Sequence, residues 1–199
     1  MKIHPSLLIL LVGLLYVLGF GGLSLLRRQG LSLRFAIEGL VIIGAGALLA
    51  LFVPVPPLLV LVVLYLITMR VRLLVDLGNW FTSRGQHRQA FATYRIATRL
   101  WPDLAGLQIV LINRGVAELG MREPETAYRT LSGALAGEEV RLGAKYLSAG
   151  YYNLGLACRR TGREQEAVRR FNEAIDALPH SLYAYAAQQA LKERSSGKE

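Results

Sequence analysis

Side chains that could catalyse a reaction or hold a metal ion are few and widely separated in this chain of 199 residues. The histidines are His4, His87 and His180, too far apart in sequence to suggest a metal-binding spacing. Cys158 is the sole cysteine, which excludes an internal disulfide and a cysteine cluster. No serine lies in a nucleophile-elbow context, and no phosphate-binding loop is present. The sequence therefore predicts neither an enzyme nor a site for a cofactor, a metal or a small-molecule substrate.

Amide and guanidinium side chains offer binding chemistry instead. Asn113 and Asn153 each carry an amide that can donate to and accept from a peptide backbone. Arg159 and Arg160 can pair with acidic side chains or a carboxylate, although two arginines are also a favourable end to a helix. Each of these four side chains could equally be solvated surface, so their role depends on the elements that position them.

Those elements fall into an apolar region and a polar region. The chain is 53% hydrophobic, and almost all of its long apolar runs lie in residues 5–69. The formal net charge is +9, and its basic residues are interspersed with acids in runs of at most two. This pattern favours attraction to anionic lipid head groups over nucleic-acid binding. We therefore expect residues 1–70 to form a membrane domain and residues 71–199 to lie in water.

The first apolar segment, about residues 6–26, carries no charged residue. About 20 residues at about 1.5 Å each would cross the hydrocarbon core of a bilayer. A signal peptide is the competing interpretation. The run is too long for a typical one and lacks an Ala-x-Ala cleavage site, so we favour a retained anchor.

Two further apolar segments, about residues 35–53 and 57–70, are separated by a proline-rich stretch. The small residues Gly46 and Ala50 in the second segment would let two helices approach closely, although small residues are common in membrane helices anyway. No helix breaker follows the third segment, so we predict one helix from Pro57 to Ser83.

Arginines flank these segments and suggest an orientation. Arg27, Arg28 and Arg34 precede the second segment, and Arg70 and Arg72 follow the third. The positive-inside rule places both groups in the cytoplasm, which a crossing or re-entrant hairpin of segments two and three would satisfy. A single kinked span would put the C-terminal half outside. We expect an integral protein of a bacterial inner or plasma membrane, with its C-terminal half in the cytoplasm.

Small and aromatic residues recur at fixed spacing in the C-terminal half. One window contains Tyr151, Tyr152, Asn153, Leu154, Gly155, Gly162, Ala167, Phe171, Ala174 and Pro179. A second copy lies 77 residues earlier, with Leu77, Gly78, Phe81, Gly85, Ala90, Tyr94, Ala97 and Pro102. A weaker copy between them keeps Gly115, Ala127, Leu131 and Ala134, with its turn glycine displaced to Gly120. The pattern resembles the tetratricopeptide repeat (TPR) family, although Cys158 stands where the family has an aromatic residue.

The resemblance implies an all-α protein, in which transmembrane helices precede a short TPR-like α-solenoid. Its repeats would cover about residues 71–104, 108–141 and 148–181, with a capping helix at 182–194 and a disordered tail at 195–199. His87 and His180 would then lie in exposed turns. In such arrays the first helices of the repeats line a concave face that binds extended peptides or partner helices.

By repeat position, that face is expected to include polar, charged and apolar side chains from all three repeats. They are Arg72, Val75, Asp76, Asn79, Ile109, Ile112, Asn113, Val116, Tyr152, Asn153, Leu156, Arg159 and Arg160. Asp76 and Ala149 stand where the chaperone-type clamp for a C-terminal carboxylate has basic residues, so capture of a chaperone tail is not expected.

Two functions remain open from the sequence. The chain could be a membrane-tethered adaptor, scaffold or assembly factor that binds a membrane-associated protein. It could instead be a stoichiometric structural subunit whose Gly46 and Ala50 pack against a larger membrane complex.

Overall fold

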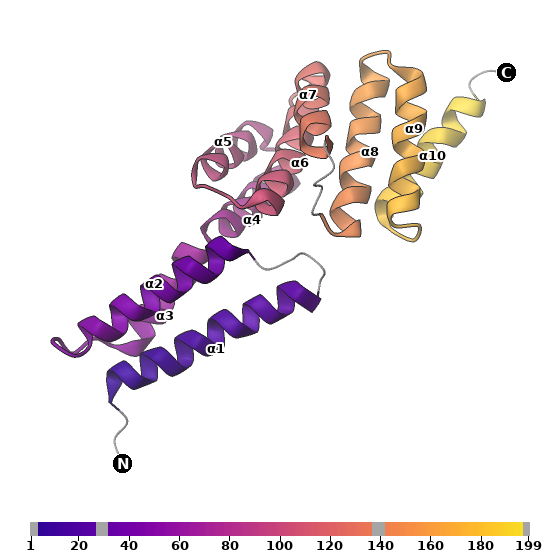
Figure 1. Cartoon of the computed structure of the whole chain (residues 1–199). Helices are drawn as coiled ribbons and strands as arrows, with labels where there is room; N and C mark the ends of the chain where they lie inside the picture. The colour runs from indigo at the N-terminus through magenta and orange to yellow at the C-terminus, as the bar shows by residue number, and fades with distance from the viewer. Residues whose placement is uncertain (1–3, 27–31, 137–141, 197–199) are drawn as a thin grey trace. The chain divides into compact units, whose positions relative to one another are not determined.

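A computed structural model describes residues 4–26, 32–136 and 142–196, which are helical throughout apart from their turns and loops (Figure 1). The helices are α1 (Pro5–Leu26), α2 (Leu33–Leu49), α3 (Pro57–Thr68), α4 (Arg70–Ser83), α5 (His87–Arg99), α6 (Leu104–Gly120), α7 (Pro124–Leu135), α8 (Ala144–Arg160), α9 (Glu164–Ala177) and α10 (Leu182–Ser196). They belong to two compact units that divide between Arg72 and Leu73. The predicted all-α class is confirmed.

The first unit packs α1, α2 and α3 against one another through small residues. A Cβ atom on Gly13 would collide with Ile43, and one on Gly46 would collide with Val60. Because glycine leaves this space empty, the helices approach closely and large side chains fill the gaps. Ala50, the other member of the predicted small-residue pair, is also buried. The pair therefore packs within the chain.

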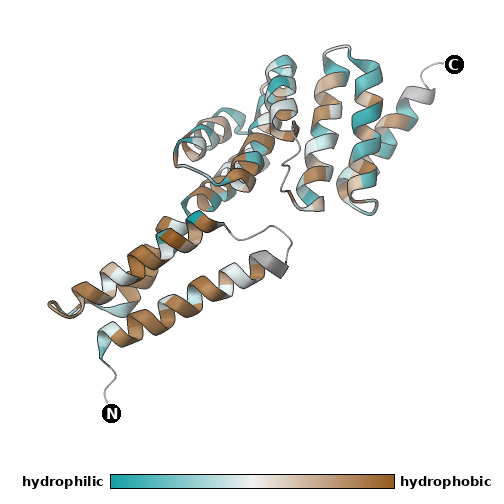
Figure 2. Ribbon diagram, viewed as in Figure 1, coloured by the Kyte–Doolittle hydropathy of each residue, from teal (hydrophilic) through white to brown (hydrophobic). Residues whose placement is uncertain are grey.

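The outward-facing side chains of these three helices are also apolar. Leu18 is 69% exposed, Val41 64% and Leu58 72%, and α1, α2 and α3 are hydrophobic around their circumference (Figure 2). A helix that is apolar all round is typical of a buried environment, either a protein core or a membrane.

Length and composition test the three predicted spans only in part. Residues Pro5–Leu23 form the one described helix that is long and apolar enough by itself to cross a membrane. Helices α3 and α4 qualify only together, as a bent pair, so the count rises to two if that pair is one span. Only 22% of this apolar segment of α1 is buried, whereas the core helix of a soluble protein is mostly buried. A signal sequence would meet the same criterion, and three spans are not established.

The predicted continuous helix from Pro57 to Ser83 is wrong. Helix α3 ends at Thr68, and Met69 leaves helical geometry with φ −97° and ψ 4° before α4 begins. The Thr68 side chain donates to the backbone oxygen of Leu64 over 2.7 Å. Such a bond back onto the preceding turn is associated with helix bending, although no proline or glycine marks this position in the sequence.

In the second unit α4 contacts α5 through Gly78 and Asn79, and the hairpins α6–α7 and α8–α9 stack after them, with α10 packed on α8 and α9. Gly78, Gly115 and Gly155 mark the three crossings. A Cβ on them would collide with Tyr94, Leu131 and Phe171, respectively. The spacing that recurs in the three hairpins thus pairs a glycine on the first helix with a large side chain on the second. The alanines that recur in the three repeats are all buried. They are Ala90, Ala97, Ala127, Ala134, Ala167 and Ala174.

The hairpin turns follow the repeat, with one exception. Gly85 and Gly162 adopt positive φ angles of 72° and 77°. The equivalent residue of the middle hairpin is Arg122, which has φ 63°. A residue with a side chain is disfavoured in this left-handed region by about 1 kcal/mol. The predicted substitute, Gly120, lies within α6, where its hydrogen atoms make room for the ring of His87.

The repeat boundaries differ modestly from those expected. Helices α6 and α8 begin at Leu104 and Ala144, four residues before the predicted repeat starts. Asp103 caps α6 by accepting from the Gly106 backbone over 2.8 Å. Ser181 accepts from the Ala184 backbone over 3.0 Å, as expected of the residue before the capping helix. Helix α10 extends to Ser196, into the segment predicted to be a tail.

Candidate protein-binding face

Helix α4 presents the most exposed part of the predicted face. Arg72, Asp76 and Asn79 are all exposed, whereas Val75 is buried. The Asn79 Oδ1 atom accepts from the hydroxyl of Tyr94 over 2.8 Å, so this amide also ties α4 to α5. Burial raises the pKa of Tyr94, which stays a hydrogen-bond donor at neutral pH. The expectation that Val75 belongs to the binding face is wrong, because it faces the core.

Asn113 and Asn153 occupy equivalent positions in the middle and last hairpins and make the same bond. The Asn113 amide donates to the Ile109 backbone oxygen, and the Asn153 amide donates to that of Ala149, each over 2.8 Å. Asn113 is half-buried and Asn153 is buried. The predicted amide donors are therefore engaged by their own helices, and the first role of these two residues is to hold the repeat.

Apolar residues of the face are partly accessible in the later repeats. Val116 and Leu156 occupy equivalent positions and are half-buried, while Ile112 lies in the core and is a wrong prediction for the face. The ring of Tyr152 lies 6.0 Å from Phe171 and 5.9 Å from Tyr183, measured between centroids. Val116 and Leu156 therefore offer partly accessible apolar area on α6 and α8.

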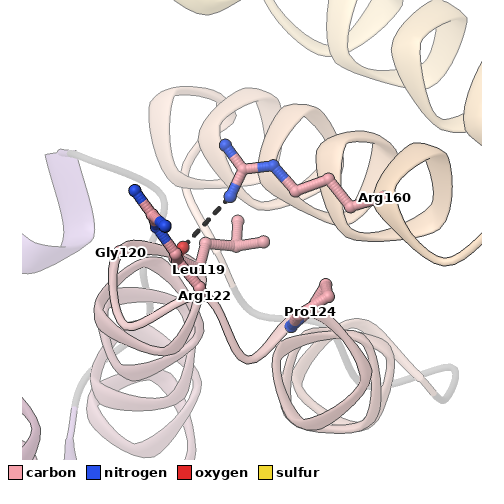
Figure 3. A pocket seen from close by; sticks show the side chains of 5 residues that line it. All are labelled: Leu119, Gly120, Arg122, Pro124 and Arg160. Atoms are coloured by element: carbon pink, nitrogen blue, oxygen red, sulfur yellow. Dashed lines mark hydrogen bonds between the residues drawn. The ribbon is translucent and has the colours of Figure 1, made fainter.

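Arg159 and Arg160 at the end of α8 have separate partners. Arg159 lies 3.7 Å from the carboxylate of Glu193 on α10, so it contacts the capping helix. Arg160 donates to the backbone oxygen of Leu119 over 3.0 Å (Figure 3). That oxygen belongs to the last turn of α6, where a cation is favourable, and it also accepts from the Arg122 backbone over 3.2 Å.

A shallow pocket of about 410 Å³ surrounds this bond, between the ends of the middle and last hairpins. Figure 3 shows the residues that line it: Leu119, Gly120, Arg122, Pro124 and Arg160. Its two charged residues are both arginines, and both side chains are exposed. Arg122 is also the residue held in the left-handed turn, so an exposed cation replaces the turn glycine at this edge of the face.

An ion pair joins the middle and last hairpins, between α7 and the residue that precedes α9. The Arg163 guanidinium binds both carboxylate oxygens of Glu125, over 3.0 and 2.9 Å, and lies over the ring of Tyr128. These hydrogen bonds lower the pKa of Glu125 and raise that of Arg163. Arg170 pairs differently, with one oxygen of Glu166 and one of Glu173, both within α9. Sequence spacing alone did not reveal these contacts between repeats.

Groups associated with catalysis remain isolated. Within residues 4–26, 32–136 and 142–196, no three histidine, cysteine or acidic side chains cluster as metal ligands. Cys158 is buried in the core of the last hairpin, and this burial raises the pKa of its thiol to about 11. His87 is half-buried under Gly120, with its Nδ1 atom enclosed, and is not the exposed turn residue expected.

Comparison with known proteins supports the fold. No family model matches the chain, and no curated protein matches it. Among solved structures it is similar to the TPR2AB domain of yeast Sti1 in a complex with pHSP90, with a TM-score of 0.54 and 25% identity. The chain contains a TPR-like helical repeat. The match covers 65% of this chain and 49% of that chain, so it spans about half the length of the Sti1 structure.

The fold points to protein–protein interaction as the general kind of function. TPR-like repeats are typically non-catalytic, and the chain shares its fold with a domain whose structure was solved in a complex with pHSP90. Of the predicted face within the second unit, Asp76 and Asn79 are exposed, and the half-buried Val116 and Leu156 add apolar area. These residues form what we call the A-helix face.

Proposed function

We propose that this chain is a membrane-anchored adaptor or assembly factor, which uses the A-helix face of its repeats to hold a partner protein at the membrane surface. The main support is the contrast between the exposed side chains of the first unit and those of the second. Helices α1 to α3 are apolar on their outer sides, whereas the hairpins that follow are largely polar outside (Figure 2). An apolar exterior is stable when hydrocarbon covers it, and a polar exterior is stable in water.

A charged cluster in the first unit supports a membrane hairpin made of α2 and α3. Glu38 accepts from Arg34 over 2.8 Å and from both terminal nitrogens of Arg70, over 2.6 and 2.8 Å. Pairing lowers the cost of placing a carboxylate near lipid. The cluster lies at the end of the hairpin away from the proline-rich turn at residues 54–57, so both arginines occupy one side.

The lengths of these helices favour a shallow hairpin. Helix α2 has 17 residues and α3 has 12, or about 26 and 18 Å, against about 30 Å for a hydrocarbon core. Whether it crosses fully or re-enters, such a hairpin returns the chain to the side on which it began. The positive-inside rule then places the repeats in the cytoplasm, at a bacterial inner or plasma membrane.

The partner is proposed to be a protein segment that lies along the first helices of the repeats. Exposed Asp76 and Asn79 offer hydrogen bonds, and Val116 and Leu156 offer apolar contacts. A chaperone tail is not the expected partner, because Asp76 would repel a terminal carboxylate and Ala149 cannot bind one. The choice of an adaptor over a structural subunit follows from Gly46, which packs against Val60 of its own chain and is not available to a neighbour.

Site-specific photocrosslinking in native membranes tests this function. A crosslinking amino acid at Asp76 or Val116 should capture the same partner protein, and one at Arg129, on the exposed side of α7, should not. Capture from Arg129 alone would move the binding site away from the A-helix face. A fixed-ratio complex after purification in mild detergent would favour the structural subunit instead.

A further inference from the structure

Helix α5 carries a stripe of exposed arginines that the repeat fold does not require. Arg88, Arg95 and Arg99 lie on one side of the helix, together with Ala92 and Ile96, and all five are exposed. Their spacing of three or four residues places them along one face. The residues on the opposite side, Ala90, Thr93, Tyr94 and Ala97, are buried. The stripe therefore points away from the core of the repeat.

The equivalent positions of the other second helices have a different charge. On α7 they are Glu125, Arg129, Ser132, Gly133 and Ala136, and on α9 they are Gln165, Arg169, Asn172, Glu173 and Asp176. The stripe thus carries a net charge of +3 on α5, zero on α7 and −1 on α9. No acidic residue occurs from Leu77 to Pro102, whereas residues 103–199 hold 13 basic and 12 acidic residues. The positive charge of the repeats is concentrated in the first hairpin.

The arginines of the stripe lack ion-pair partners among the described residues. No ion pair of the described residues involves Arg88, Arg95 or Arg99, whereas Arg163, which precedes α9, and Arg169 and Arg170 within it all pair with glutamates. Like charges along one helix face repel, which disfavours the folded hairpin in isolation. An anionic surface outside the molecule would remove this cost.

Trp101, two residues after the end of α5, adds a large exposed apolar group close in sequence to Arg99. It follows α5 with φ 48° and is 83% exposed. This left-handed position after a helix is usually occupied by glycine, because a side chain costs about 1 kcal/mol there. Ile96, on the stripe itself, is 52% exposed. A tryptophan and an isoleucine among unpaired arginines match the composition of a surface that sits at the boundary of lipid and water.

We propose that the stripe of Arg88, Arg95 and Arg99, with Ile96 and Trp101, docks onto the anionic head groups of a phospholipid bilayer. The inference rests on the proposed membrane location, because α4, 14 residues or about 21 Å long, is all that links α5 to the apolar unit. Lipid is favoured over nucleic acid, because the exposed residues between the arginines of the stripe, Ala92 and Ile96, are not aromatic and Trp101 alone cannot stack successive bases, whereas the apolar groups suit a bilayer interface.

Fluorescence of Trp101 in the full-length protein tests the proposal. With Trp80 replaced by Phe, the protein is reconstituted into phosphatidylcholine vesicles or vesicles that also contain phosphatidylglycerol, each with brominated lipid as a quencher. Quenching of Trp101 should be strong only with phosphatidylglycerol and should weaken as salt is raised. Replacing Arg88, Arg95 and Arg99 by Gln should shift the ratio of docked to undocked hairpin by up to about 100-fold.

The matched control replaces Arg163, before α9, and Arg169 and Arg170 within α9 by Gln, which removes the same charge and should leave quenching unchanged. Equal quenching in both lipids, or equal loss in both triple variants, would overturn the proposal. Release of the stripe by an added RNA oligonucleotide, with no effect of lipid composition, would assign it to nucleic acid instead. Carbonate extraction reports the anchor separately, so loss of anchoring and loss of docking are distinguishable.

Discussion

The two units bring their helices together in the same way but differ in what they expose. Gly46 makes room for Val60 in the first unit, as Gly155 makes room for Phe171 in the second. Outside these crossings, α1 to α3 expose leucine, valine and phenylalanine, and the repeat hairpins expose mainly charged and polar residues. Close packing therefore identifies which helices pair, while the outward-facing residues identify the solvent that each unit requires.

The largest expected effect comes from filling a crossing in the second unit. A methyl group on Gly155 would meet the Phe171 ring at 2.6 Å, so Gly155→Ala should lower the free energy of unfolding by about 1–3 kcal/mol. Gly133→Ala is the matched control, since nothing lies within 4 Å of its added Cβ and alanine favours a helix. Denaturation followed by circular dichroism measures both. Equal stabilities would contradict the assigned crossing.

A second pair of substitutions asks whether the first unit depends on the same packing. Gly46→Ala would collide with Val60, whereas Gly44→Ala, two residues away, meets nothing within 4 Å. We expect Gly46→Ala to lower stability in mild detergent by about 1–2 kcal/mol and Gly44→Ala to leave it unchanged or slightly raised. Thermal aggregation of the detergent-solubilised protein reports the difference. A larger effect at Gly44 would mean that α2 packs through its other face.

Titration of Cys158 sharpens the description of the second core. Because burial raises the pKa of this thiol to about 11, its neutral form is favoured in the folded protein. The corresponding stability is complete below the pKa of an unfolded thiol and is lost as pH rises from there toward 11, by about 1 kcal/mol near pH 10. A Cys158→Ala variant should lose less stability over this range. Rapid labelling of native Cys158 by iodoacetamide at neutral pH would contradict its burial.

The smallest effect concerns the turn of the middle hairpin. Arg122→Gly would restore the residue found at Gly85 and Gly162 and relieve the positive φ angle, for a gain of about 0.5–1 kcal/mol. Arg129→Gly, within the exposed side of α7, should instead lower stability by a similar amount. Calorimetry can resolve the two signs. A loss of stability in Arg122→Gly would show that the arginine side chain makes a stabilising contact at the pocket edge.

Much of the repeat was visible in the sequence because its geometry depends on residue size. Gly155, Ala167 and Phe171 have equivalents at the same offsets, and each set meets at a crossing as predicted. Side-chain partners were less predictable. Asn153 donates to its own helix, and Arg159 pairs with the capping helix, contacts that depend on three-dimensional proximity more than on residue type.

The helix break at Met69 has no signal in the sequence, whereas the exposed arginines of α5 have one. The interruption at Met69 has neither proline nor glycine beside it, so the sequence pattern does not indicate that the helix ends there. By contrast, the absence of acids between Asp76 and Asp103 is plain in the sequence. The sequence does not show that Arg88, Arg95 and Arg99 share one exposed side of a helix, which the structure does show.

Spin labels on a Cys158→Ser chain reconstituted in vesicles test the central claim most directly. One label replaces Val41, which is 64% exposed on α2, and another replaces Arg129, exposed on α7. Collisions with oxygen should dominate at residue 41 and collisions with a water-soluble nickel chelate at residue 129, because hydrocarbon concentrates oxygen and excludes the chelate. Equal access of the nickel chelate to both labels would place α2 in water and contradict the proposed division of the chain between lipid and water.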